Sequence, residues 1–289
     1  MDTPVQALEG PPIDTLAPIM SAEELIPLPA PDDRVHSWWT EHRQRLARKA
    51  LEGEVFDNYV VKEEMLEVFP KKAERGDRLP PDFLRECGNL MGQKWVQDKL
   101  DGYVDPVAEP TEAISEKTAS QLYYLARLEQ LSSGQQLGHV VEIGAGFGNL
   151  ALLTLALGGC SRYTIIDLPD VLPISRSYLS AHLSPEQLAK VEFIDAMDTD
   201  ALTAFAGTEA DIVVSTFALT EMPAAMRRWY AAFVLSKAGA FYVVGQRTFK
   251  GEDAGGFAEY VQRPFTLTVQ PYLYDPIGWP TFEMFGRAA

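Results

Sequence analysis

The sequence has 289 residues, of which 46% are hydrophobic, so it can build one large domain with an appendage or two domains. Its 41 acidic and 25 basic residues give a formal net charge of −16. A chain this acidic repels phosphate backbones and anionic lipid surfaces, which disfavours nucleic acid and membranes as partners.

The N-terminus and the cysteines give no sign of secretion or of metal binding. The stretch MDTPVQALEGPPID lacks the basic start and apolar run of a signal peptide, and no run approaches the ~18 apolar residues that span a bilayer. Cys87 and Cys160 have no CxxC or Cys/His cluster beside them, so neither a zinc site nor a disulfide framework is indicated. We therefore expect a cytoplasmic protein with two reduced thiols and no bound metal.

The first third of the chain is irregular and then helical. Residues 1–33 are rich in proline and acidic residues, which predicts an arm that can lie on its own body or on a partner's in a homodimer. Helical periodicity begins in SWWTEHRQRLARKALEGEVF and continues at about 60–69, 80–91 and 92–101. A Gly- and Pro-bearing connector follows at 102–111. We therefore divide the chain into an arm and helical cap, 1–110, and a second domain, 111–289.

In the second domain, strand-like apolar runs alternate with helices. An amphipathic helix capped by Ser115 is expected over 115–131. Strands are expected at 139–144, 163–168, 190–195, 211–217 and 240–246, with helices between them at 148–158, 170–181, 198–205 and 222–236. This alternation predicts an α/β fold with a mostly parallel, Rossmann-like sheet covered on both faces. RPFTLTVQPYLYD and PTFEMFGR then predict a closing hairpin.

The loop GAGFG follows the first expected strand. Its glycines, Gly144, Gly146 and Gly148, allow the backbone to approach a ligand closely. A dinucleotide loop has the spacing G-x-G-x-x-G, but here the spacing is G-x-G-x-G and Glu142 precedes it. This acid suits a cation, such as S-adenosylmethionine with its sulfonium and α-amino group, better than a pyrophosphate. NAD binding and a glycine turn without a ligand are the alternatives.

Acidic residues at the ends of the next two strands suit the same ligand. Asp167 can accept hydrogen bonds from ribose hydroxyls, and Asp195 can accept one from the adenine amino group, with Ala196 or Met197 covering the ring. The residues expected at the cofactor are Tyr123, Glu142, Gly144, Ala145, Gly146, Gly148, Asn149, Asp167, Leu168, Asp195, Ala196 and Thr216.

The segment from about 115 to 246 resembles class I S-adenosylmethionine-dependent methyltransferases, through VVEIGAGFGNLA and YTIIDLPDVLPISRSYLS. With STFALTEMP, these stretches are more narrowly similar to bacterial sugar O-methyltransferases. The resemblance implies a seven-stranded sheet whose last strand is antiparallel, an S-adenosylmethionine cofactor, and a small-molecule acceptor such as a sugar. It also implies that the N-terminal segment caps the active site, and that the helix carrying Tyr123 and Tyr124 reaches the methionine end of the cofactor. Packing in the core is the alternative for one of these two tyrosines.

Transfer of a methyl group to a hydroxyl requires an aligned acceptor and a group that removes a proton. Glu221 follows the fourth expected strand and is the first candidate base, although it can equally stabilise the start of the next helix. His36 and His42 are further candidates if the cap covers the pocket. Gln246 and Arg247, at the end of the fifth expected strand, are expected to contact acceptor hydroxyls.

Two tryptophans and several carboxylates admit more than one interpretation. Trp38 and Trp39 can stack on a sugar face, or they can belong to a helix that packs its aromatic residues inward. Asp195, Asp198 and Glu221 could hold magnesium, but their spacing does not require a metal.

Three functions follow from these patterns. The first is O-methylation of a sugar or a glycosylated small molecule, as in natural-product biosynthesis. The second is N-methylation of an amino sugar or of another small natural product. The third, of a different class, is a catalytically silent methyltransferase fold that serves as a binding or scaffold subunit.

Overall fold

A seven-stranded sheet forms the centre of the structure, a computed structural model that describes residues 26–36, 39, 82–108, 113–273 and 280–289. Its strand order is β3-β2-β1-β4-β5-β9-β8. The bounds are β1 His139–Ile143, β2 Arg162–Asp167, β3 Val191–Asp195, β4 Ala210–Thr216, β5 Ala238–Gln246, β8 Phe265–Pro271 and β9 Thr281–Ala288. Strands β1 to β5 are parallel, whereas β9 is antiparallel to both of its neighbours. The predicted parallel sheet, the closing hairpin and the antiparallel last strand are therefore confirmed.

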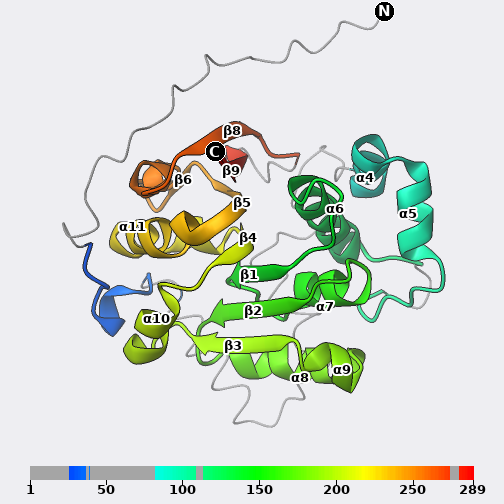
Figure 1. Ribbon diagram of the computed structural model, residues 1–289, viewed down its shortest axis with the longest axis horizontal. Helices are drawn as coiled ribbons and strands as arrows, with labels where there is room; N and C mark the ends of the chain where they lie inside the picture. Colours follow the sequence, from blue (N-terminus) through cyan, green and yellow to red (C-terminus); the bar gives the residue numbers. More distant parts are fainter. Residues whose placement is uncertain (1–25, 37–38, 40–81, 109–112, 274–279) are drawn as a thin grey trace, which may run out of the picture.

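Helices cover both faces of this sheet (Figure 1). One face carries α4 Phe83–Met91, α5 Gln93–Leu100, α6 Glu116–Leu131, α7 Asn149–Ala156, α8 Leu172–His182 and α9 Pro185–Leu188. The other carries α10 Thr199–Phe205 and α11 Ala224–Phe233. Neighbouring strand residues enter opposite cores: Val140 packs with the α6 side and Val141 with the α11 side. The continuous apolar runs of β1, β2, β4 and β5 therefore arise because these inner strands are buried on both faces.

Short elements that the sequence did not indicate follow β5. Strands β6 Thr248–Phe249 and β7 Glu252–Asp253 form a small separate hairpin, and the 3-10 turn η5 Gly256–Tyr260 packs beside α11. Strands of two residues are too short to show a hydrophobic period, so no pattern was available to predict them.

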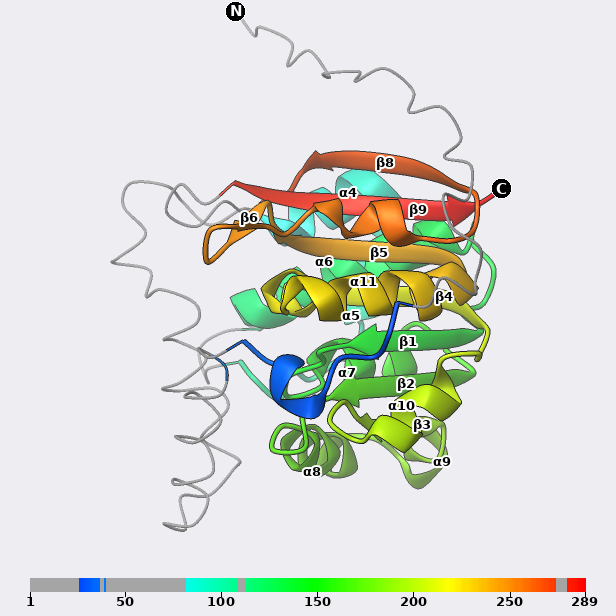
Figure 2. The ribbon, with the colours of Figure 1, turned by 90° about the vertical axis from the view of Figure 1, so that its left-hand side faces the viewer.

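The described parts of the first 110 residues pack on both faces of the sheet. Phe83 and Cys87 of α4 belong to the same core as Leu122 and Leu125 of α6. Residues 26–36, which we call the N-terminal strap, run in blue along the α10–α11 face in Figure 2 and include the 3-10 turn η1 Pro31–Asp33. The helix predicted at 60–69 lies outside the described residues, and the domain boundary at 110 stays a prediction.

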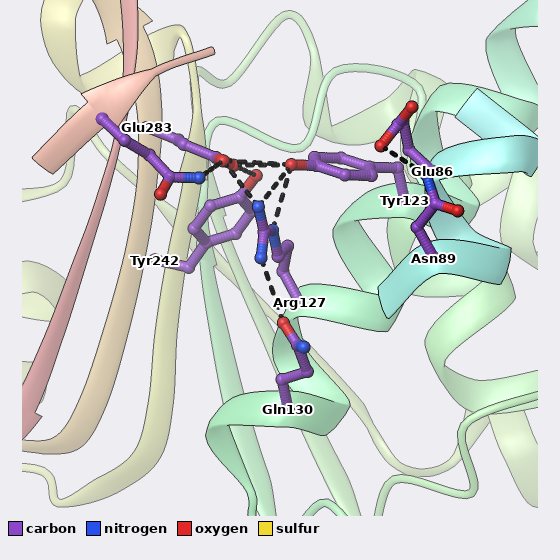
Figure 3. Close-up of polar contacts among 8 residues, drawn as sticks. Glu86, Asn89, Tyr123, Arg127, Gln130, Tyr242 and Glu283 are labelled. Carbon is purple, nitrogen blue, oxygen red and sulfur yellow. Dashed lines mark hydrogen bonds and ion pairs between the residues drawn. The ribbon is translucent and has the colours of Figure 1, made fainter. Parts of the chain in front are cut away.

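A buried carboxylate ties α6 to the C-terminal strands (Figure 3). Glu283 of β9 has no exposed surface, and Arg127 of α6 donates to its Oε1 at 2.7 Å. The hydroxyls of Tyr123 and Tyr242 donate to the same carboxylate at 3.0 and 2.9 Å, and the Gln270 amide of β8 donates as well. Removing one partner from such a group leaves the others buried and unpaired.

We predict that Glu283→Ala lowers the free energy of unfolding by about 3–5 kcal/mol, because the Arg127 guanidinium would stay buried without its carboxylate. Urea denaturation followed by circular dichroism measures the loss. Asp98→Ala is the control: it breaks the exposed pair between Lys94 and Asp98 on α5 and should change stability little. An equally small effect of both substitutions would show that the Glu283 cluster does not hold α6 to the sheet.

Candidate functional site

Three carboxylates meet at the carboxyl edge of the parallel strands. Glu142 lies on β1, Asp167 ends β2, and Asp195 ends β3 directly opposite Asp167 in the strand register. The backbone N–H of Gly144 donates to the Ile166 carbonyl at 2.9 Å, which joins the glycine loop to β2. The structure therefore brings together the acids that the sequence placed at successive strand ends.

The glycine loop depends on backbone conformations that other residues rarely adopt. Gly144 and Gly148 have φ angles of +77° and +94°. A Cβ at Gly144 would also collide with Ala218, which begins the 3-10 turn η3 Ala218–Glu221 after β4. Gly144, Ala145 and Gly146 are partly exposed although Ile143 before them and Phe147 after them are buried, so this part of the loop is accessible from outside.

Glu142 is a carboxylate with almost no access to water. It is 1% exposed, and the Tyr163 hydroxyl donates to its Oε2 at 2.7 Å. Burial raises the pKa of Glu142 to about 7; the Tyr163 hydrogen bond opposes this shift, Asp167 adds to it, and Lys117 opposes it. At neutral pH this group is balanced between its two charge states, and a bound cation would ionise it.

Lys117, in the first turn of α6, is a site residue that the sequence analysis missed. Its charge acts on Glu142, and its Nζ lies 5.8 Å from the centroid of the Phe147 ring. Burial lowers the pKa of Lys117 to about 8, which Glu142 opposes. The one available signal was a cation in the first turn of a helix, where the helix dipole disfavours it.

Tyr123, expected at the cofactor, is buried and contacts the C-terminal strands. It follows Lys117 by six positions on α6, so its side chain leaves the helix in a different direction. Its hydroxyl donates to Glu283 and accepts from Arg127, within the cluster of Figure 3. Tyr124 bonds to the hydroxyl of Tyr272 at 2.7 Å. The expectation that this pair reaches the methionine end of the cofactor stays a prediction, while Lys117 is the residue of α6 whose charge acts on Glu142.

Asp167 is held in place by backbone donors. Leu168 N–H donates to its Oδ1 at 2.7 Å and Gly146 N–H to its Oδ2 at 3.0 Å. Burial raises the pKa of Asp167 to about 6, and these hydrogen bonds oppose the shift. Each oxygen retains a second lone pair, so the carboxylate can still accept hydrogen bonds from a diol.

The remaining residues expected at the cofactor lie around this edge in different environments. Asp195 is partly exposed and its Oδ1 accepts from Met197 N–H at 2.7 Å, while Ala196 is 7% exposed. Thr216 ends β4 and is half-buried. Asn149 is 2% exposed, and its amide bonds to the hydroxyls of Thr118 and Tyr178, so it links α7 to α6 and α8.

Glu221 lies at the end of η3 and contacts the N-terminal region. It is 7% exposed, and the Trp39 indole N–H donates to its Oε2 at 3.0 Å. Burial raises the pKa of Glu221 to about 7, and the Trp39 hydrogen bond opposes the shift. Helix α11 begins three residues later, at Ala224, and within the described ranges the carboxylate accepts from Trp39 rather than from a backbone N–H of that helix.

The other residues expected on the acceptor side are less closely grouped. The His36 ring meets Phe249 of β6 edge-on, with 5.5 Å between ring centroids. Gln246 N–H donates to the Thr220 hydroxyl at 3.4 Å, and Arg247 is exposed at the start of the β6 hairpin. His42 and Trp38 lie outside the described residues.

The β4 loop between these groups contains a strained residue. Phe217 has a φ of +71°, a conformation that is costly for a bulky side chain. Its N–H donates to the Val244 carbonyl at 2.7 Å, and its ring lies 6.0 Å from that of Tyr272. The surrounding contacts therefore fix this loop, and with it the position of η3 and Glu221.

Within the residues that the structure describes, no group of three or more His, Cys, Asp or Glu side chains could hold a metal ion. Over the same residues, no helix has the length and apolar character needed to cross a membrane. Cys87 and Cys160 are buried free thiols. The expectation of no bound metal stays a prediction.

No family model and no curated protein matches this sequence. Among solved structures, the chain is similar to the methyltransferase domain of bacterial CtHen1, at 14% identity and a TM-score of 0.45 over 60% of this chain and 98% of that one. It is also similar to the glycopeptide N-methyltransferase MtfA crystallised with S-adenosylhomocysteine, at 16% identity and a TM-score of 0.43 over 63% and 94%. A third is an rRNA methylase from Streptococcus thermophilus, at 15% identity and a TM-score of 0.41 over 57% and 95%.

Likeness at these identities concerns the arrangement of the chain alone. The seven-stranded sheet and its antiparallel last strand, β9, are those that the sequence resemblance implied, so the Rossmann-like α/β fold class is confirmed.

Glu221 should make stability depend on pH. Its folded pKa of about 7 lies above the value of 4.5 expected in the unfolded chain, so the folded state loses stability as pH rises between these values. We predict that Glu221→Gln matches the wild type at pH 4 and is more stable at pH 8, by about 3 kcal/mol at most. Urea unfolding at both pH values measures this.

A matched control is Glu186→Gln, which changes an exposed carboxylate on α9 and should shift stability little at either pH. If Glu221 instead supports the start of α11, Glu221→Gln should be less stable at pH 8, by about 0.3–1 kcal/mol. A loss at pH 8 would therefore contradict the first prediction.

Proposed function

We propose that this chain is an S-adenosylmethionine-dependent methyltransferase. The observation that carries the proposal is the order of charges along the strand edge: Lys117 and Glu142 lie at the glycine loop, and Asp167 and then Asp195 follow toward β3. A ligand that suits this order has a zwitterion at one end, a diol in the middle and a hydrogen-bond donor at the other end. S-adenosylmethionine has these three parts in the same sequence.

In this proposal each part of the cofactor would have a partner. Glu142 would attract the α-ammonium group and Lys117 the α-carboxylate of the methionine end. Asp167 would accept hydrogen bonds from the ribose hydroxyls. Asp195 would accept one from the adenine amino group through Oδ2, since Oδ1 already accepts from Met197 N–H.

The same charges disfavour the NAD alternative. A pyrophosphate at the glycine loop would lie beside Glu142 and Asp167, which are both nearly buried. Anions placed together with little solvent repel strongly and would force proton uptake. The methionine end of S-adenosylmethionine avoids this repulsion.

For the acceptor, we propose the hydroxyl of a sugar or of a glycosylated small molecule, with Glu221 as the general base. A pKa of about 7 is well matched to accepting a proton near neutral pH. The bound cofactor supplies an electrophilic methyl group on its sulfonium. Glu221 would take the hydroxyl proton, and Trp39, already in contact with that carboxylate, would present an aromatic face to the sugar ring. On this view the N-terminal 110 residues contribute a wall of the acceptor pocket.

The cofactor proposal is tested by isothermal titration with S-adenosylhomocysteine. We expect micromolar-range binding that is lost in Asp167→Ala, because the ribose would lose its acceptor. NAD should not bind. Tight NAD binding without binding of S-adenosylhomocysteine would overturn the proposal.

The same titration across pH 6.5–9 tests the roles of Glu142 and Lys117. Affinity requires Glu142 ionised and Lys117 protonated, so it should rise as pH passes about 7 and fall as pH passes about 8. Glu142→Gln should weaken binding and remove the rise, and Lys117→Met should weaken binding and remove the fall. A wild-type affinity independent of pH would contradict these two assignments.

The acceptor proposal is tested by incubating sugar nucleotides and glycosides with methyl-labelled cofactor. With an accepted sugar, Glu221→Gln should keep S-adenosylhomocysteine affinity and lower kcat by about 10²–10⁴-fold, the usual contribution of a positioned base. Labelling of amino sugars alone would favour N-methylation. Tight cofactor binding without any labelling would favour a scaffold subunit.

A further inference from the structure

The N-terminal strap reaches the end of β3 from a distant part of the sequence. Ile26 and Leu28 pack against the core beneath α10 and α11, and the strap then turns through η1 (Figure 2). Arg34, directly after η1, is 4% exposed. Its guanidinium lies against the loop 195–198, which joins β3 to α10.

Arg34 links the strap to this loop through four hydrogen bonds. Nε donates to the Pro29 carbonyl of the strap at 2.8 Å. Nη1 donates to the carbonyls of Ala196 and Met197 at 3.2 and 3.1 Å, and Nη2 donates to the Thr199 hydroxyl at 2.8 Å. All four acceptors are uncharged oxygens, and the charges of Asp195 and Asp198 in the same loop also attract the guanidinium. In another loop conformation the buried guanidinium would lose these hydrogen bonds, which would lower the stability of the folded chain.

The loop that Arg34 holds is the one that carries the candidate adenine contacts. Asp195 Oδ1 accepts from Met197 N–H, and Ala196 N–H donates to the Asp167 carbonyl at 2.8 Å. The carbonyls of residues 196 and 197 are therefore bound by Arg34, while their N–H groups fix the loop to Asp195 and β2. Bonds on both sides of the peptide backbone leave this loop little freedom.

We propose that Arg34 is a positioning residue for the adenine of the cofactor: it holds the loop 195–198 in the conformation in which Asp195 receives the adenine amino group. The inference rests on the proposed function and extends it. It makes the N-terminal strap part of the cofactor site, whereas the sequence indicated only a cap on the acceptor side.

The test compares two ligands that differ in one group. The first is S-adenosylhomocysteine; the second is its analogue in which purine replaces adenine, so that the 6-amino group is missing. Wild-type protein should bind the first more tightly, by about tenfold or more, since one hydrogen bond to a charged group is lost in the second. Arg34→Ala should weaken binding of S-adenosylhomocysteine by about tenfold and leave the purine analogue nearly unchanged, so that the ratio approaches one.

Arg227→Ala is the matched control. Arg227 of α11 is 3% exposed on the same face of the sheet, and it donates to the Met222 and Asp253 carbonyls and to Glu252. Its loss should lower stability as the loss of Arg34 does, yet leave the ratio of the two affinities at the wild-type value.

The outcomes separate the inference from the proposed function. A folded Arg34→Ala protein with the wild-type ratio, whether both ligands weaken equally or neither does, overturns the positioning role. If circular dichroism shows that Arg34→Ala does not fold, Arg34→Lys is used in its place, because one ammonium cannot reach all four acceptors; a reduced ratio supports the role and an unchanged ratio overturns it. Wild-type protein that binds neither ligand overturns the proposed function itself.

Discussion

Three carboxylates side by side at the carboxyl edge of β1, β2 and β3 are the constraint around which the rest of the site is arranged. Glu142 and Asp167 are nearly buried, and burial alone would leave both neutral. The groups that favour the ionised form of these two acids are hydrogen-bond donors or cations. They are the Tyr163 hydroxyl, the backbone N–H groups of the glycine loop, and Lys117. These groups offset part of the effect of burial, which leaves the pKa of Glu142 at about 7 and that of Asp167 at about 6.

The grouping of acids at this edge could be predicted from the sequence, because parallel strands all point in the same direction. The carboxyl ends of parallel strands lie at one edge of the sheet, so Asp167 and Asp195 could be placed at the same edge from their positions in the chain. Their direct opposition follows from the pairing of β2 with β3. The rotation of a helix about its own axis is set by packing, and no pattern distinguished Lys117 from Tyr123 on α6. Arg34 was also beyond prediction, since its contacts with residues 196–199 join parts of the chain more than 160 positions apart. The burial of Glu283 could not be predicted either, because a strand pattern of alternating residues does not indicate that a glutamate is buried.

The N-terminal part of the chain is less separate than its composition indicated. Helix α4 shares the core of α6, the strap shares the core of α11, and Trp39 contacts Glu221. Only five positions separate Arg34, at the loop after β3, from Trp39, at the turn after β4. One short segment therefore contacts both the loop proposed to bind adenine and the proposed acceptor base. The positions of these two parts of the site depend on the same segment.

A cost in stability accompanies this arrangement. Glu142 and Glu221 have pKa values raised to about 7 and Asp167 to about 6, so each destabilises the folded chain as pH rises through these values. A net charge of −16 adds general repulsion between the many other acids. A ligand that brings positive charge to the glycine loop relieves part of this repulsion in the folded state alone, and binding and folding therefore reinforce each other. Glu142 directly precedes the glycine loop, so its share of this cost is the part that a cationic ligand at that loop would relieve.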